Sequence, residues 1–131
     1  MNLLLIITLL ASIQFVVFGG FVGAARGKGN VKAPAITGDV HFERTFRVHY
    51  NTMEQLIAFL PGLWAFGLLI DEHIAAALGL IYLVGRIVYF RQYIKDPALR
   101  GPGMLISAVP IYLLLLGGLG AAVWQTIASA T

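Results

Sequence analysis

The chain has 131 residues, of which 59% are hydrophobic and only 11% are charged, and its formal net charge is +3. Soluble domains usually carry about 25% charged residues, and a domain this small has too little interior to hide so much apolar surface. The composition therefore excludes a soluble domain. It predicts a membrane protein whose surface is largely covered by lipid, with no nucleic-acid partner.

The first predicted membrane span covers residues 2–25, and no charge interrupts it before Arg26. The small residues Gly23, Ala24 and Ala25 resemble a signal-peptide cleavage site. However, no Lys or Arg precedes the stretch, and it is longer than an ordinary signal-peptide core. We therefore expect a retained membrane helix, followed by a loop that Gly and Pro residues punctuate.

The second predicted span begins as an amphipathic helix near His41, after an N-cap among residues 37–39. Its fully apolar part, residues 56–70, is too short to cross a bilayer alone, because a membrane helix needs about 20 apolar residues. The polar turns before it must complete the span. Pro61 is expected to kink this helix, since proline cannot donate a backbone hydrogen bond.

The third and fourth predicted spans cover residues 74–93 and 104–128. Asp71, Glu72 and His73 are expected to form the very short turn before the third span. Three adjacent residues cannot all face one ion on a helix, so we expect no metal site.

Glycines punctuate the last part of the chain. Gly101, Pro102 and Gly103 are expected to act as a stop signal rather than as a phosphate-binding loop, because no strand precedes them. The glycine run at residues 117–120 is expected to permit close helix packing. With no internal repeat, we predict a single domain over residues 1–131, an all-α integral membrane bundle of four transmembrane helices.

The basic residues predict the orientation in the membrane. All nine Lys and Arg residues belong to the first and third connections or to the helix ends beside them. Under the positive-inside rule, both termini should face away from the cytoplasm of a bacterial inner membrane or of the endoplasmic reticulum. The nine residues are Arg26, Lys28, Lys32, Arg44 and Arg47 at the first connection, and Arg86, Arg91, Lys95 and Arg100 at the third.

The chain contains no cysteine. Disulfides, thiolate metal sites and a thiol nucleophile of the protein itself are therefore excluded. If sulfur chemistry takes place here, the sulfur must arrive with a substrate.

Two rows of polar side chains are predicted at membrane depth, each on one helix face. Residues at i, i+4 and i+7 share a face, as do residues at i, i+3 and i+7. Polar groups are costly in lipid and therefore face the protein interior or a cavity. The rows are Arg47, Asn51 and Glu54 in the second helix, and Arg86, Tyr89 and Tyr93 in the third.

These groups suit a zwitterionic ligand that also carries acidic groups. Arginine binds carboxylates through paired, charge-assisted hydrogen bonds. A glutamate can receive an ammonium group, and an asparagine can meet a peptide bond with both a donor and an acceptor. An arginine also favours the ionised form of a nearby thiol. Glutathione carries all of these groups, although other anionic peptides or lipid head groups would fit similar residues.

Structural explanations stay open for both rows. Polar groups inside membranes commonly pair with one another, so Arg47, Asn51 and Glu54 could form an interhelical network. Tyr89 and Tyr93 could belong to an aromatic belt at the membrane interface.

Two sequence blocks resemble those of a known family. The first, at residues 42–54, contains the pattern Glu-Arg-x-x-Arg-x-x-x-Asn-x-x-Glu, and the second reads Gly-Arg-Ile-Val-Tyr-Phe-Arg-Gln-Tyr at residues 85–93, with Arg100 after it. In these blocks the chain is similar to the membrane-associated proteins in eicosanoid and glutathione metabolism, the MAPEG family. The resemblance implies a four-helix bundle that assembles as a homotrimer, with glutathione bound between neighbouring subunits near the cytoplasmic face.

The resemblance also implies roles for individual residues. Arg100, together with Tyr93, would hold the thiol of glutathione as a thiolate. His49 lies on the opposite side of its helix from Asn51, so it would reach the ligand across a subunit boundary. The implied glutathione ligands are Arg26, Arg47, His49, Asn51, Glu54, Tyr89 and Tyr93.

We therefore predict a membrane-bound glutathione transferase, with glutathione peroxidase activity as a second expectation. Glutathione would be the co-substrate, and its thiolate would attack a lipophilic electrophile that arrives from the bilayer. Two alternatives stay open. One is a small four-helix transporter, although the acidic residue expected in the first span of such a protein is missing here. The other is a protein of the MAPEG fold that binds ligands without catalysis.

Overall fold

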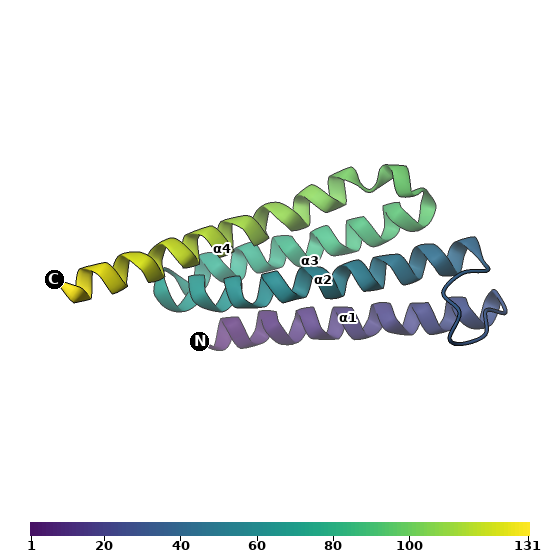
Figure 1. Ribbon diagram of the computed structural model, residues 1–131, viewed down its shortest axis with the longest axis horizontal. Helices are drawn as coiled ribbons and strands as arrows, with labels where there is room; N and C mark the ends of the chain where they lie inside the picture. The colour runs from purple at the N-terminus through teal and green to yellow at the C-terminus, as the bar shows by residue number, and fades with distance from the viewer.

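The computed structural model describes residues 1–131 and consists of four long helices (Figure 1). They are α1 (Asn2–Lys28), α2 (Val40–Leu69), α3 (Glu72–Lys95) and α4 (Gly101–Ala130), with a short 3-10 turn, η1 (Pro97–Leu99), before α4. Each of the four helices is long and apolar enough to cross a membrane. The prediction of an all-α bundle with four membrane spans is therefore confirmed.

Successive helices run in opposite directions, so both termini lie at one end of the bundle (Figure 1). The α1–α2 and α3–α4 connections lie together at the other end, which we call the basic end because all nine Lys and Arg residues are in or near them. Helices α2 and α3 each pack against both α1 and α4. The bundle thus has α2 and α3 at its centre, with α1 and α4 on either side.

Aspartates begin two of the helices. The side chain of Asp39 accepts a hydrogen bond from the backbone nitrogen of Phe42 at 2.9 Å, and Asp71 accepts one from Ile74 at 2.8 Å. These bonds satisfy amide groups that have no partner within the first helical turn. The N-cap expected among residues 37–39 is confirmed at Asp39.

The connection between α2 and α3 is shorter than predicted. Only Ile70 and Asp71 lie between the two helices, and Glu72 and His73 already belong to α3. The expectation that all three polar residues form the turn was wrong, because Asp71 alone supplies the cap and the helix begins directly after it.

The residues Gly101, Pro102 and Gly103 form the first turn of α4, so the prediction that they are a stop signal was wrong. Proline is well placed in a first turn, where its missing N–H would have no partner within the helix. Gly103 lies against α3: a Cβ atom added to it would be 2.4 Å from the backbone nitrogen of Tyr89. Helices α3 and α4 therefore meet backbone to backbone at this point.

The glycine run of α4 packs against α2. A Cβ atom on Gly118 would lie 2.9 Å from the Cβ of Ala65, and one on Gly117 would lie 2.7 Å from the ring of Phe66. Gly120 faces open space. The prediction of close helix packing is confirmed for Gly117 and Gly118 but not for Gly120.

The main apolar core reaches the polar row of α3 at Tyr82, which is fully buried. The rings of Tyr82 and Phe59 are stacked, with centroids 3.9 Å apart. Arg86 follows one turn later on the same helix face. The core therefore fixes the rotation of α3, and with it the direction in which the polar row points.

A side-chain hydrogen bond joins α1 and α2 within this apolar region: Nε1 of Trp64 donates to Oγ1 of Thr8 at 2.8 Å. We expect Trp64→Phe to lower the free energy of unfolding by about 0.6 kcal/mol, the average for such bonds inside membranes. Reversible unfolding in mixed micelles measures this difference. The matched control is Trp124→Phe, since Trp124 is 71% exposed; an equal loss in both variants would contradict the prediction.

Candidate functional site

A buried arginine connects the two predicted polar rows. Arg86 is only 1% exposed, and its Nη2 donates a hydrogen bond to Oδ1 of Asn51 at 2.7 Å. Its Nη1 donates to Oγ of Ser107 at 3.3 Å. One side chain of α3 therefore contacts α2 and α4 at the same level, and it brings Asn51 and Tyr89 together as the two rows predict.

No carboxylate neutralises Arg86 within the chain, because the only ion pair of the structure joins the N-terminal ammonium group of Met1 to Glu72. The guanidinium group instead lies 4.3 Å from the centroid of the Tyr89 ring, where the π electrons attract the cation. The Nε atom of Arg86 and the hydroxyl of Tyr82 are buried without a hydrogen-bond partner. Ionisable groups buried among membrane helices usually mark functional sites.

The two tyrosines of the α3 row extend from this centre toward the basic end. Tyr89 is 4% exposed, and its ring centroid lies 5.5 Å from that of Tyr93, which is half-buried. Tyr89 and Tyr93 therefore line α3 between the buried Arg86 and the basic end.

The α2 row faces the outside of the subunit. Asn51 is half-buried, whereas Arg47 and Glu54 are exposed. Neither Arg47 nor Glu54 has an ionic partner in the chain, and the guanidinium group of Arg47 lies 5.9 Å from the centroid of the Tyr50 ring. Since Oδ1 of Asn51 accepts from Arg86, its side-chain N–H groups stay available. The row presents a cation, two amide donors and a carboxylate to a ligand.

Arg26 is engaged elsewhere in the same subunit. Its Nη1 donates to the carbonyl oxygens of Ala35 at 2.8 Å and Val31 at 3.4 Å, and its guanidinium group lies 4.6 Å from the centroid of the Phe42 ring. These contacts hold the α1–α2 loop over the end of α1. Arg26 shares no hydrogen bond with the α2 row.

His49 points toward α1. Its ring stacks on Phe15 with centroids 4.3 Å apart, and a Cβ atom on Gly19 would lie 3.2 Å from its Nε2. Asn51 instead points toward Arg86 of α3. A single subunit therefore does not bring His49 and Asn51 onto the same side of α2.

Arg100 is exposed at the start of α4. Its Nη1 donates to the carbonyl oxygen of Pro97 at 2.9 Å, within the preceding 3-10 turn. This bond holds the guanidinium group at the basic end of the bundle.

Ser107 also belongs to the group of side chains around Arg86, although the sequence pattern did not indicate it. It is 1% exposed, and its hydroxyl donates to the carbonyl oxygen of Gly103 at 2.8 Å while it accepts from Arg86. A lone serine in an apolar helix gives little signal by itself. It becomes informative only when the register of α4 against α3 is known.

Arg44 was predicted only as an orientation charge, and the structure gives it a further contact. Its Nη1 donates to the carbonyl oxygens of Ile94 at 3.1 Å and Lys95 at 3.0 Å. These carbonyls belong to the last turn of α3 and have no partner within the helix. Arg44 therefore fixes the end of α3, and with it the neighbourhood of Tyr93. Its place in the Glu-Arg pair of the first sequence block was the available signal.

The arrangement can hold a zwitterion. An exposed guanidinium group, free amide donors and an exposed carboxylate lie along one face, and a buried cation stabilises their middle member. Such a face can bind a carboxylate, a peptide carbonyl and an ammonium group in order along one helix.

Comparisons with known proteins identify the relatives of the chain. The model of the MAPEG family matches residues 3–120. The chain is 43% identical over 120 residues to an uncharacterized protein from Synechocystis sp., and the aligned part covers 92% of this chain and 88% of the relative. It is 39% identical over 121 residues to microsomal glutathione S-transferase 2 from Homo sapiens, covering 92% and 82%. It is 37% identical over 113 residues to leukotriene C4 synthase from Cavia porcellus, covering 86% and 75%.

Proposed function

Because this chain belongs to the MAPEG family, we propose that it is a membrane-bound glutathione S-transferase. Its relatives include glutathione transferases and leukotriene C4 synthases, which supports a glutathione-using membrane enzyme. Glutathione is the proposed co-substrate, and a lipophilic electrophile from the bilayer is the second substrate. Glutathione peroxidase activity would use the same activated thiol.

The open α2 row is the observation that carries the proposal. Arg47 and Glu54 are exposed without an ionic partner in the chain, and Asn51 between them is held by a buried arginine. Arg47 would bind a carboxylate of glutathione, Glu54 its ammonium group, and the N–H groups of Asn51 a peptide carbonyl. Tyr89 and Tyr93 would contact the ligand from α3.

The proposed chemistry begins with ionisation of the glutathione thiol. Arg100, with Tyr93, would stabilise the thiolate, because a nearby positive charge lowers the pKa of a thiol. The thiol proton goes to solvent. The thiolate sulfur then forms a bond to the electrophilic carbon, and the electron pair of the bond that breaks leaves with the departing group or opens a strained ring.

We propose that the site is completed by a second copy of the chain in a homotrimer. Arg26 and His49 are assigned as glutathione ligands by the family resemblance, yet both are held against α1 or its loop in this subunit. Asn51 points to α3 instead. Contribution of Arg26 and His49 to the site of the neighbouring subunit would reconcile the assigned roles with these positions.

We also propose that the basic end faces the cytoplasm, so that both termini lie on the other side of a bacterial inner membrane or of the endoplasmic reticulum. Since the chain has no cysteine, a single cysteine introduced at Thr131 can be labelled without background. Labelling by an impermeant reagent from the cytoplasmic side would contradict the orientation.

Calorimetry of glutathione binding tests the proposed function. Binding to the detergent-purified protein is measured in two buffers with different ionisation enthalpies. Binding with proton release supports a site that ionises the thiol. Binding without proton release would favour a non-catalytic binding protein, and no binding near millimolar glutathione would overturn the proposal.

The carboxylate of Glu54 has its own test. We expect Glu54→Gln to weaken glutathione binding about fivefold, because an exposed ion pair contributes up to about 1 kcal/mol. The matched control is Glu43→Gln, which changes an exposed glutamate of the same helix that accepts from the backbone nitrogen of Gly38. Equal affinities for wild type and Glu54→Gln would remove Glu54 from the site.

The role of Arg100 is tested by the pH dependence of turnover. We expect Arg100→Ala to raise the pKa of the thiol of bound glutathione by about one unit, which lowers the thiolate fraction at neutral pH about tenfold. The pH profile of turnover should move to higher pH by the same amount, while glutathione affinity changes little. Full turnover with an unchanged profile would show that Arg100 does not stabilise the thiolate.

A further inference from the structure

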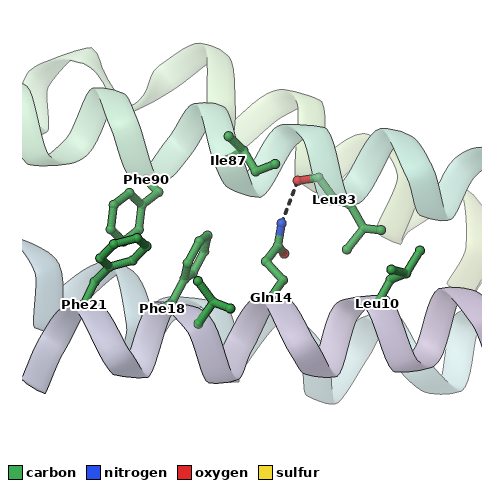
Figure 2. Close-up of a pocket in the computed structure, with 8 residues that line it drawn as sticks. Leu10, Gln14, Phe18, Phe21, Leu83, Ile87 and Phe90 are labelled. Atoms are coloured by element: carbon green, nitrogen blue, oxygen red, sulfur yellow. Dashed lines mark hydrogen bonds between the residues drawn. The ribbon is translucent and has the colours of Figure 1, made fainter.

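An apolar groove runs along the surface between α1 and α3 (Figure 2). It has a volume of about 410 Å³, and seven of its eight lining residues are hydrophobic. The exception is Gln14, whose Nε2 donates to the carbonyl oxygen of Leu83 at 2.9 Å across the groove. This Nε2 is tied to the protein and the Oε1 of the same amide is buried without a hydrogen-bond partner, so the groove offers its occupant mainly hydrocarbon.

A second, smaller hollow of about 130 Å³ lies next to the groove on the side of the basic end. Phe21 and Phe90 line both spaces, and their ring centroids lie 5.3 Å apart. Figure 2 shows these two rings facing each other at one end of the groove, with Leu10 at the opposite end. The smaller hollow is also lined by Lys28 and His41, so the apolar groove ends beside a cation and an imidazole.

The length of the groove matches one leaflet. At a rise of about 1.5 Å per residue, the stretch of α1 from Leu10 to Phe21 is about 16 Å long. The hydrocarbon core of a bilayer is about 30 Å thick, so the groove covers about half of it. Lys28 lies beyond Phe21 by nearly two helical turns, at the depth expected for a head group.

We propose that this groove binds one acyl chain of an anionic phospholipid from the leaflet at the basic end, with the lipid phosphate at Lys28 and His41. The acyl chain would replace water or a disordered lipid along the hydrophobic lining of the groove. The cationic end selects an anionic head group, because basic residues near the membrane surface attract anionic lipids. No residue of the α2 row lines either hollow, so this site is separate from the proposed glutathione site.

Native mass spectrometry of the delipidated, detergent-purified protein tests the head group. Phosphatidylglycerol and phosphatidylcholine are titrated separately, and we expect tighter binding of phosphatidylglycerol. Lys28→Gln should weaken phosphatidylglycerol binding about fivefold, since one basic residue contributes about 1 kcal/mol to such attraction, and should leave phosphatidylcholine unchanged. The control is Lys32→Gln, because Lys32 lines a different hollow. Equal effects of the two substitutions on phosphatidylglycerol would overturn the assignment of the head group.

A pair of adjacent valines tests the acyl-chain groove. Val17 lines the groove, whereas Val16, its neighbour, does not and is 71% exposed. Val17→Trp should fill the groove and abolish the tight lipid adduct, and Val16→Trp should keep it, with thermal unfolding showing that both variants are folded. Retention of the adduct by folded Val17→Trp would overturn the proposal. Copurification of free fatty acid in place of phospholipid would also overturn it. The Lys28→Gln result does not depend on the folding of either tryptophan variant.

Discussion

Replacing Gly103 with alanine is expected to destabilise the protein by about 2–3 kcal/mol, as overpacking of a well-packed contact does. The added Cβ atom would lie 2.4 Å from the nitrogen and 2.5 Å from the Cα of Tyr89. These atoms belong to the backbone of α3, so they cannot turn aside as a flexible side chain can. Helices α3 and α4 must separate, and the hydrogen bond between Arg86 and Ser107 should lengthen with them. Reversible unfolding in mixed micelles measures the loss of stability.

The same turn of α4 supplies the control for this prediction. A Cβ atom on Gly101 meets nothing within 4 Å, so Gly101→Ala changes only helix propensity. Alanine is favoured over glycine in helices by up to about 1 kcal/mol, and Gly101→Ala should therefore be neutral or slightly stabilising. If both alanine variants were equally stable, the close approach of α3 and α4 at Gly103 would not exist in the folded protein.

Replacing Arg86 with methionine is expected to separate stability from ligand binding. The guanidinium group is buried without an acidic partner, and an uncompensated buried charge is itself costly, so an apolar side chain in its place should not destabilise the protein. Ser107 keeps its hydrogen bond to Gly103. Asn51, however, loses the group that fixes its side chain. We expect the thermal midpoint to hold or rise, while glutathione affinity falls by about 2 kcal/mol, roughly thirtyfold, as for the loss of a hydrogen bond to a charged group.

Arg91→Met is the matched control, because Arg91 is an exposed arginine of the same helix. It should leave both the thermal midpoint and glutathione affinity nearly unchanged. Thermal unfolding and calorimetry on the two variants give both quantities. A large loss of stability in Arg86→Met would show that Arg86 is mainly a structural tie, and unchanged affinity would show that it does not position Asn51 for the ligand.

The fold was predicted from the sequence because its determinants are local. Long apolar runs give the four spans, and Asp39 begins α2 as its sequence pattern indicates. The error at Gly103 arose because its role depends on a distant part of the chain. Gly103 was interpreted as part of a loop because its neighbours are Gly and Pro, whereas its actual role is to admit the backbone of α3. No local pattern shows which distant backbone will approach a glycine.

The candidate site was predictable only to the level of single helix faces. Helical spacing placed Arg86 and Tyr89 on one face of α3, and the structure brings that face to Asn51. The spacing could not identify Ser107, because that contact depends on how α4 is offset along α3. It also could not show that His49 stacks on Phe15 of α1, because the rotation of α2 between two neighbours is a property of the whole bundle.

The two-residue connection between α2 and α3 has a consequence for biogenesis. A charged side chain inside a membrane helix carries an insertion cost, about 2.5–3.5 kcal/mol at the centre of the helix and less toward the end where Arg86 lies, so α3 inserts more readily when its arginine has a partner. Its partner Asn51 lies on α2, and Ile70 and Asp71 leave no slack between the two helices. Helices α2 and α3 should therefore leave the translocon as one hairpin, in which Arg86 meets Asn51 before either helix is exposed to lipid.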